Sequence, residues 1–132
     1  MSEPAHRVRY TYEEYRLFED STDVKHEYLD GQILAMAGGT PSHAALAAAV
    51  IGNLERQLEG QPCYTLTADL RVRIPATGIA TYPDVTVVCG DALFDSHDSN
   101  AVVNPTLLVE VLSDRTEAYD SDEKLEHYRQ LP

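Results

Sequence analysis

The sequence predicts a single α/β domain in which helices pack on a central mixed β-sheet. Its 132 residues match the usual length of one domain. Hydrophobic residues make up 43% of the chain and charged residues 24%, which is ordinary usage for a globular protein. Helical patterns alternate with short apolar runs, and the last two runs are nearly continuous, as in strands buried on both faces.

The N-terminal part predicts a short helix followed by a β-hairpin. Thr11 and Glu14 have the spacing of a capping box, and aromatic side chains follow along one helical face. The next segment, HEYLDGQILAMA, has apolar stretches on both sides of Asp30 and Gly31. These two residues tolerate the positive φ angles of a type I′ turn, so a hairpin is expected here.

A longer helix is expected from Thr40 and Pro41, which match an N-cap residue and the first residue of a helix. The alanine-rich run continues to about Leu58, and Gly60 suits a left-handed cap. Because alanine side chains are small, this helix would be stabilised mainly by close packing on the sheet. A last helix is expected at about 118–130.

The strands are predicted from four apolar runs, CYTLT, LRVRI, DVTVVC and TLLVEVLS. The segments near residues 69–74, 83–89 and 106–112 are expected to lie side by side in one sheet, with the long helix on one face. The polar residues 90–104 are expected to form a loop between the last two strands, with or without a short turn of helix.

Two features bear on the compartment of the protein. Cys63 and Cys89 stand in apolar, strand-like runs without the C-x-x-C spacing of a redox or zinc motif, and we interpret them as buried thiols. No apolar run approaches the roughly 20 residues of a membrane span, and the N-terminus MSEPAHRVRY lacks the apolar core of a signal peptide. A cytoplasmic protein without a membrane partner is therefore expected.

The net charge of −12 at pH 7 disfavours a nucleic-acid enzyme, because DNA affinity comes largely from cations that neutralise phosphates. Arg71 and Arg73 lie two positions apart, so they would share one face of a strand and form a local cationic strip. Such a strip could contact nucleic acid. A half-exposed strand with solvated arginine side chains explains the same pattern.

Three acidic residues occupy positions where burial is costly. Asp84 opens an apolar strand, Glu110 lies inside LLVEVL, and Glu27 lies on the first strand of the predicted hairpin. A buried carboxylate is usually paired, protonated or bound to a metal. One such acid is more often a strand-end residue neutralised by arginine, but three together indicate a site. Carboxylate oxygens suit Mg²⁺ or Mn²⁺, and there is no Cys/His cluster that would suit zinc.

The acids also carry a resemblance to a known family. Pro83 and Asp84, with Glu110 standing 26 positions after the aspartate, resemble the signature of the PD-(D/E)XK nuclease superfamily. More closely, the chain resembles the Uma-type family of restriction endonucleases, catalogued as a domain of unknown function. The matching stretches cover nearly the whole chain and are YTYEEY, KHEYLDGQILAMAGGTPSH, DLRVRIP, YPDVTVV, LLVEVLS and AYDSDEKLEHYRQLP.

The resemblance implies a restriction-endonuclease-like core that binds Mg²⁺ or Mn²⁺ and hydrolyses phosphodiester bonds, with DNA as the expected substrate. Asp84 and Glu110 would hold the metal directly, and Val111 would contribute its backbone carbonyl oxygen. Glu27 matches an additional acid of the family and would bind the metal directly or through water. Without a cation the three acids would repel one another, so removing one is expected not to lower the stability of the metal-free protein.

The chain departs from the superfamily motif at Leu112, where the motif has lysine. In the family the lysine lies on the following helix, and Lys124 is the matching residue. It would orient the attacking water or neutralise charge on the phosphate. Alternatively, Lys124 and Asp120 stand four apart on a helix and form an ordinary surface ion pair. For His43, which the family also carries, a capping, phosphate-contacting or catalytic role is open.

The resemblance presents residues 1–132 as one nuclease-like domain that lacks the C-terminal strands of the family. An exposed sheet edge and a duplex substrate both favour two-fold pairing, so at least a homodimer is expected. The leading hypothesis is a metal-dependent DNA endonuclease. Two alternatives are a non-catalytic binding or regulatory protein that retains the fold, and a metal-dependent hydrolase of small phosphoesters.

Overall fold

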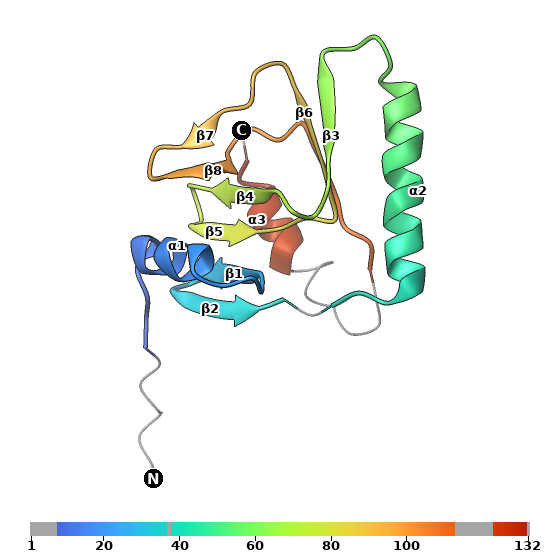
Figure 1. Ribbon diagram of the computed structural model, residues 1–132. Coiled ribbons are helices and arrows are strands. Elements are labelled where there is room, and N and C mark those ends of the chain that lie inside the picture. Colours follow the sequence, from blue (N-terminus) through green and yellow to red (C-terminus); the bar gives the residue numbers. More distant parts are fainter. Residues whose placement is uncertain (1–7, 37, 113–122, 132) are drawn as a thin grey trace.

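The computed structural model describes residues 8–36, 38–112 and 123–131 of the chain (Figure 1). Its helices are α1 (Tyr12–Asp20), α2 (Pro41–Gln57) and α3 (Leu125–Tyr128). Its strands are β1 (His26–Leu29), β2 (Gln32–Ala35), β3 (Cys63–Leu66), β4 (Arg71–Ile74), β5 (Ile79–Thr81), β6 (Val85–Cys89), β7 (Phe94–Asp95), β8 (Asp98–Val102) and β9 (Leu107–Val109).

The strands form two sheets. The larger sheet has the order β2-β1-β5-β4-β8-β7, in which β4 and β8 are parallel and the other neighbours are antiparallel. The smaller sheet is antiparallel and has the order β3-β6-β9. Buried aliphatic side chains from β4, β5, β6 and β8 form the core. The predicted class, a mixed sheet flanked by helices, is confirmed.

The first helix and the hairpin form as predicted. The Thr11 side chain accepts the backbone N–H of Glu14, and the Glu14 carboxylate accepts the backbone N–H of Thr11, so the capping box is complete. In the hairpin, Asp30 and Gly31 have φ angles of 50° and 75°, and β1 pairs with β2 directly on either side of them. Local sequence therefore determines this part of the chain.

The long helix α2 also begins where the sequence predicts. Thr40 is the N-cap, its hydroxyl accepts the backbone N–H of His43, and Pro41 is the first helical residue. The helix ends at Gln57, and Gly60 just beyond it has a φ of 81°. It packs on β3 and β6 with one face only, and no residue of α2 is buried (Figure 1).

One prediction about the sheet is wrong, because β4 does not lie beside β6 and β9. The run from β3 to β4 and the run from β5 to β6 are two arms of a long hairpin that is broken in the middle. Five residues (67–71) separate the paired positions Leu66 and Val72, whereas four residues (82–85) separate Thr81 and Thr86.

The break has a physical cause. Pro83 lacks a backbone N–H and cannot donate to the ladder. On the other arm, the N–H of Leu70 turns back to the carbonyl of Thr67 at 3.2 Å. The two arms therefore pair with different neighbours on the two sides of the break.

The segment 90–104, which was predicted to be a loop, contains two short strands, β7 and β8. Asp98, Ser99 and Asn100 have low strand propensity, so the sequence gives little local signal. Ala101 and Val102 are 0% and 1% exposed and pair with β4 in parallel. Tertiary contacts with β4 outweigh the polar composition of this segment.

The last predicted helix is described in part. Residues 113–122, which include Ser113 and Asp120, lie outside the described residues, and α3 covers Leu125–Tyr128. Lys124 directly precedes α3 in helical backbone geometry.

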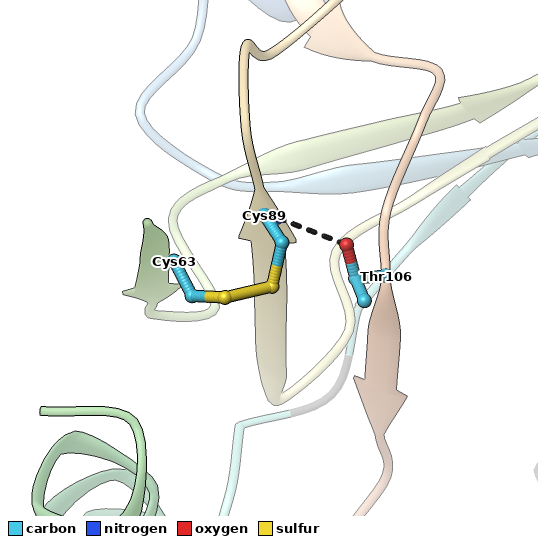
Figure 2. The surroundings of a disulfide bond; sticks show 3 residues. All are labelled: Cys63, Cys89 and Thr106. Carbon is cyan, nitrogen blue, oxygen red and sulfur yellow. Dashed lines mark hydrogen bonds between the residues drawn. A yellow bond between two sulfur atoms is a disulfide. The ribbon is translucent and has the colours of Figure 1, made fainter. Parts of the chain in front are cut away.

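The two cysteines form a disulfide, which corrects their interpretation as buried thiols (Figure 2). Cys63 on β3 is the direct cross-strand partner of Cys89 on β6, and their Cα atoms are 3.9 Å apart. The Cys89 N–H donates to the hydroxyl of Thr106 at 2.9 Å, just before β9. The sequence does not reveal the pairing because the 26-residue separation is bridged only once the register of β3 and β6 is known.

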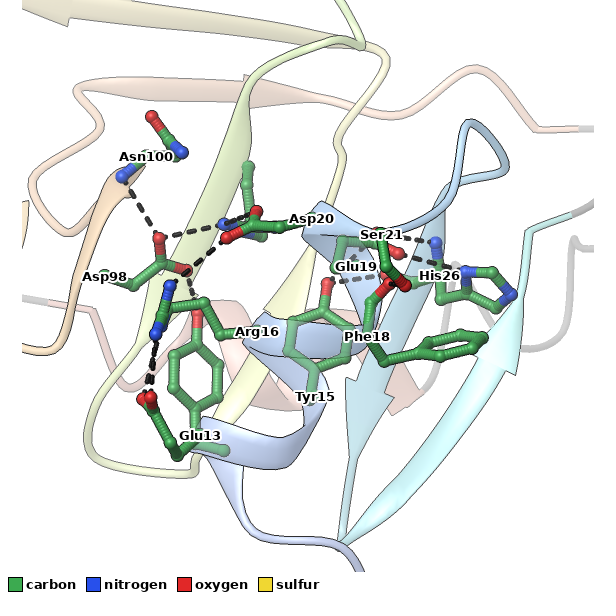
Figure 3. A network of polar contacts seen from close by, with 12 residues as sticks. Glu13, Tyr15, Arg16, Phe18, Glu19, Asp20, Ser21, His26, Asp98 and Asn100 are labelled. Atoms are coloured by element: carbon green, nitrogen blue, oxygen red, sulfur yellow. Dashed lines mark hydrogen bonds and ion pairs between the residues drawn. The ribbon is translucent and has the colours of Figure 1, made fainter.

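A network of polar contacts attaches α1 to the larger sheet (Figure 3). The Arg71 guanidinium lies 2.8 Å from Asp98, and the Tyr12 hydroxyl donates to the other oxygen of Asp98 at 2.5 Å. Arg71 also donates to the Tyr82 hydroxyl at 3.2 Å, which in turn donates to Glu19 at 2.7 Å. Buried charges on β4 and β8 are thereby compensated by α1 and by each other.

These contacts set the ionisation of the network. Burial acts to raise the pKa of Asp98, but hydrogen bonds from Arg71 and Tyr12 outweigh it and hold the pKa below its ordinary value. Burial and the hydrogen bond to Glu19 raise the pKa of Tyr82 to about 12. The folded protein therefore favours an ionised Asp98 and a neutral Tyr82.

The disulfide leads to a first prediction. Reducing it, or replacing both cysteines with serine, should lower the free energy of unfolding by about 3 kcal/mol, because a closed loop of this length restricts the unfolded chain. Urea denaturation with and without dithiothreitol measures the effect, and the double-serine variant should not respond to the reductant. Two titratable thiols in the native protein would restore the interpretation as free cysteines.

A second prediction concerns acid stability. Because the pKa of Asp98 is lower in the folded protein than in the unfolded chain, its contribution to stability is present above about pH 4 and is lost as the pH falls through the folded value. Asp98→Asn should lower stability at pH 7 by about 3 kcal/mol, since Arg71 loses its buried partner. Its stability should then vary less between pH 5 and 2 than that of the parent, measured by urea denaturation. Asp23→Asn, at an exposed acid, should leave the acid dependence unchanged.

Candidate functional site

A buried lysine meets two of the predicted acids on the face of the larger sheet that α3 covers. The Lys124 ammonium lies 2.8 Å from Glu27 Oε1 and 3.4 Å from Glu110 Oε1. Its side chain is 4% exposed, and those of Glu27 and Glu110 are 9% and 14% exposed. Charges this deeply buried are costly unless they are paired, so the three side chains stabilise one another.

Two hydroxyl groups of the described residues also contact these acids. The Thr81 hydroxyl donates to Glu27 Oε1 and the Tyr128 hydroxyl donates to Glu110 Oε1, each at 2.5 Å. Strands β1 and β5 are antiparallel, and Tyr28 pairs with Ala80. The neighbouring residues Glu27 and Thr81 therefore lie opposite each other. The strand register therefore brings the hydroxyl of Thr81 to the carboxylate.

The register of the smaller sheet brings Asp84 next to Glu110. Val85 on β6 pairs with Val109 on β9, so Asp84 and Glu110 stand opposite each other just beyond the end of this ladder. Residues in opposed positions project to the same side of a sheet. Asp84 Oδ2 accepts the backbone N–H of Val111 at 2.6 Å, which connects the aspartate to the peptide that follows Glu110.

His43 reaches the same place from the first turn of α2. Its Nε2 lies 3.2 Å from Asp84 Oδ1, and its side chain is 22% exposed. The ring packs so closely on the backbone of Gly39 that a Cβ added there would lie 2.8 Å from His43 Nδ1. The glycine and the Thr40 cap thus fix the start of α2 with the histidine directed at Asp84.

The structure therefore brings together the acids and the lysine that the sequence singled out. Glu27, Glu110 and Lys124 are in direct contact, and Asp84 adjoins them across the end of the β6–β9 ladder. Among the residues that the structure describes, Thr81 and Tyr128 contact this cluster although sequence reasoning did not assign them to it. Tyr128 stands one helical turn after Lys124 on the same face, but from sequence alone this position is more typical of a core residue than of a ligand. Thr81 gives no such signal.

The expected cationic strip on β4 is not present at the surface. Arg71 is 4% exposed and is paired with Asp98. The Arg73 guanidinium stacks on the ring of Tyr12 at 3.6 Å and donates to the carbonyl of Gly78. Both arginines face α1 rather than solvent, so neither presents a free guanidinium to a phosphate.

The donor atoms of the site suit a hard divalent cation, because they are carboxylate oxygens. Among the residues that the structure describes, however, no three His, Cys, Asp or Glu side chains gather closely enough to hold a metal ion. The Lys124 ammonium lies between Glu27 and Glu110, and the His43 ring contacts Asp84. The expectation that the acids repel one another without a metal did not include Lys124, whose ammonium is shared by Glu27 and Glu110. The effect on stability of removing one acid stays a prediction.

Comparisons with known proteins place the chain in a family. Residues 12–132 match the family model Uma2, described as "Putative restriction endonuclease", and the chain belongs to this family. Its mixed sheet flanked by helices is accordingly a restriction-endonuclease-like fold.

Two curated relatives come from Synechocystis sp. and are named as uncharacterized proteins. The first, slr1290, is 38% identical over 91% of this chain and 62% of its own length. The second, sll1609, is 30% identical over 90% of this chain and 67% of its own length. This chain thus spans about two thirds of the length of these relatives. Within the described ranges, the structure contains no helix with the length and apolar character of a membrane span.

A third prediction tests the buried contacts of Lys124. Lys124→Met should lower the free energy of unfolding by about 3 kcal/mol or more, because Glu27 and Glu110 lose their shared cation while remaining buried. Lys25→Met is a matched control, since Lys25 is 40% exposed in its pair with Asp69 and should cost less than about 1 kcal/mol. Equal small losses in both variants would favour a surface ion pair for Lys124.

Proposed function

We propose that the chain is a metal-dependent endonuclease that hydrolyses phosphodiester bonds, with DNA as its substrate. The observation that carries this proposal is the contact of Lys124 with Glu27 and Glu110, next to Asp84. A lysine supplied by a helix, in place of the usual lysine two residues after the acid, gives the same combination of acids and ammonium that the nuclease signature has. Membership of a family described as restriction endonucleases supports the same function.

In this proposal Glu27, Asp84 and Glu110 hold Mg²⁺ or Mn²⁺, and the backbone carbonyl of Val111 is a further ligand. The bound ion would polarise the scissile phosphate and lower the pKa of a water molecule. Lys124 would neutralise negative charge on the phosphate from its place beside the acids. For Lys124 to do so, its contacts with Glu27 and Glu110 must loosen when the cation enters, since the ammonium is already shared by both carboxylates.

His43 has a supporting role in this proposal. Its ring contacts Asp84 from the first turn of α2 and is partly exposed, so it could turn from the aspartate to a phosphate oxygen of the substrate. Arg71 and Arg73 are left out of the substrate contacts because both are engaged with α1. A homodimer and a cytoplasmic place of action belong to the same proposal. Disulfides are rare in the cytoplasm. Whether Cys63 and Cys89 are oxidised or reduced in the cell therefore bears on the proposed cytoplasmic location.

A non-catalytic binding protein is the second candidate, and one observation favours it. The cations that would meet DNA are used inside the fold, with Arg71 held by Asp98 and Lys124 held by two glutamates. A hydrolase of small phosphoesters would be less affected by the net charge of −12. Substrate assays on both polymers and small diesters distinguish these candidates from the leading one.

A fourth prediction concerns the metal. Mn²⁺ at a hundredfold excess over its dissociation constant should raise stability by about 2.7 kcal/mol, which corresponds to several degrees in melting temperature. Asp84→Ala should abolish both this shift and the cleavage of plasmid DNA. Asp23→Ala, which removes an exposed acid, should retain both.

Specific outcomes would contradict the proposal. An unchanged melting curve of the parent in millimolar Mn²⁺ would contradict the claim that the protein binds a metal ion. Metal binding with intact plasmid, single-stranded DNA, RNA and bis(p-nitrophenyl) phosphate would favour the non-catalytic protein. Cleavage of the small diester alone would favour the small-molecule hydrolase.

A further inference from the structure

We propose that Thr81 and Tyr128 are positioning residues, which hold the carboxylates of Glu27 and Glu110 on either side of the Lys124 ammonium. The positioning role depends only on contacts within the fold. The expected effect of these two residues on metal affinity rests on the proposed function.

Thr81 is suited to fix Glu27. It lies on β5 with 0% exposure, and its hydroxyl is 2.5 Å from Glu27 Oε1. A β-branched residue on a strand has few side-chain rotamers, so the hydroxyl is already oriented before Glu27 meets it. Glu27 is long and flexible, and this contact selects one of its conformations.

Tyr128 fixes Glu110 in a corresponding way from the other side of the lysine. It stands four residues after Lys124, so both side chains leave the same helical face. Its hydroxyl is 2.5 Å from Glu110 Oε1, the same oxygen that lies 3.4 Å from the ammonium. The phenol has two rotatable bonds before a rigid ring, so it sets the position of Glu110 with little freedom of its own.

Among the described residues, a neutral hydroxyl donates to each glutamate, and both glutamates contact the same ammonium. The hydroxyls add no charge to the cluster. In metal sites, hydrogen-bond partners of the ligands typically contribute 10–100-fold to metal affinity because they orient the ligand atoms. Loss of either hydroxyl should thus allow its carboxylate to rotate away and leave Lys124 shared unevenly.

The chain supplies matched controls. Thr86 lies on β6, is 0% exposed like Thr81, and its hydroxyl has no hydrogen-bond partner among the described residues. Thr86→Val therefore removes a buried hydroxyl that positions nothing, whereas Thr81→Val removes one that holds Glu27. Thr81→Ser keeps the hydroxyl on a less restricted side chain and should retain most of the parent behaviour. Tyr64→Phe, at a side chain on β3 that is 62% exposed, is the control for Tyr128→Phe.

The test combines two measurements on each variant. The first is the ¹⁵N NMR signal of the Lys124 ammonium in metal-free protein, assigned with Lys124→Met. It should be protected from solvent exchange in the parent, in Thr81→Ser and in both controls, and it should broaden or disappear in Thr81→Val and Tyr128→Phe. The second is the dissociation constant for Mn²⁺ by calorimetry, which should rise about tenfold or more in Thr81→Val and Tyr128→Phe only.

The two measurements test the proposed function and the positioning role separately. If the parent does not bind Mn²⁺, the proposed metal-dependent function fails, and the ammonium signal alone decides the positioning role. The positioning role is overturned if the parent shows no protected ammonium. It is also overturned if Thr81→Val and Tyr128→Phe match Thr86→Val and Tyr64→Phe in the ammonium signal. A changed ammonium signal with unchanged Mn²⁺ affinity would overturn the consequence for metal affinity.

Discussion

The burial of the Lys124 ammonium between Glu27 and Glu110 is the constraint on which the arrangement of the larger sheet and α3 depends. The three side chains come from β1, from the residue after β9 and from the residue before α3. Each of them would be expensive to bury alone. The compensation exists only when all three elements are in place, so these charged contacts couple the N-terminal hairpin to the C-terminal helix. Specificity of this kind is a better-supported role for buried ion pairs than a large gain in stability.

The second determinant of the site is the break in the hairpin at Pro83. If the strand from Ile79 to Cys89 ran without interruption, Asp84 would pair within a ladder. Because the proline interrupts the pairing, β6 leaves the larger sheet and joins β9, and Asp84 stands at the end of a different ladder opposite Glu110. The proline-aspartate motif therefore has a structural role in this fold. Proline ends one strand, and the aspartate then lies at the junction of the two sheets.

Sequence reasoning succeeded where the physical cause is local or is carried by a single residue pattern. The Thr11 capping box, the Asp30–Gly31 turn and the Thr40 N-cap depend on contacts within a few residues, and all three appear in the structure. The acids could be predicted because a carboxylate among apolar strand residues is costly to bury and therefore stands out in the sequence. Lys124 came from the family resemblance, since its own surroundings in sequence suggest a surface helix equally well.

The parts that sequence could not provide depend on register and on distant partners. The pairing of Cys63 with Cys89 requires the β3–β6 register, and the strand at Asp98 is formed by contact with β4 in spite of its polar sequence. The sequence shows that Arg71 and Arg73 share a face but does not show what covers it. Tyr12, Asp98 and Tyr82 cover it, and the first two lie far from both arginines in the chain.

Because several cationic side chains are used inside the fold, fewer are left on the surface to contact DNA. The chain has ten lysine and arginine residues against 22 acids, and Arg71, Arg73 and Lys124 are directed into the fold. DNA affinity normally grows with the number of phosphates that protein cations neutralise. A protein with this charge balance could approach DNA only if bound metal ions, helix N-termini or a partner supplied part of the missing positive charge. If the proposed function holds, the affinity for DNA would depend more on divalent cations at Asp84 and Glu110 than on arginine or lysine contacts.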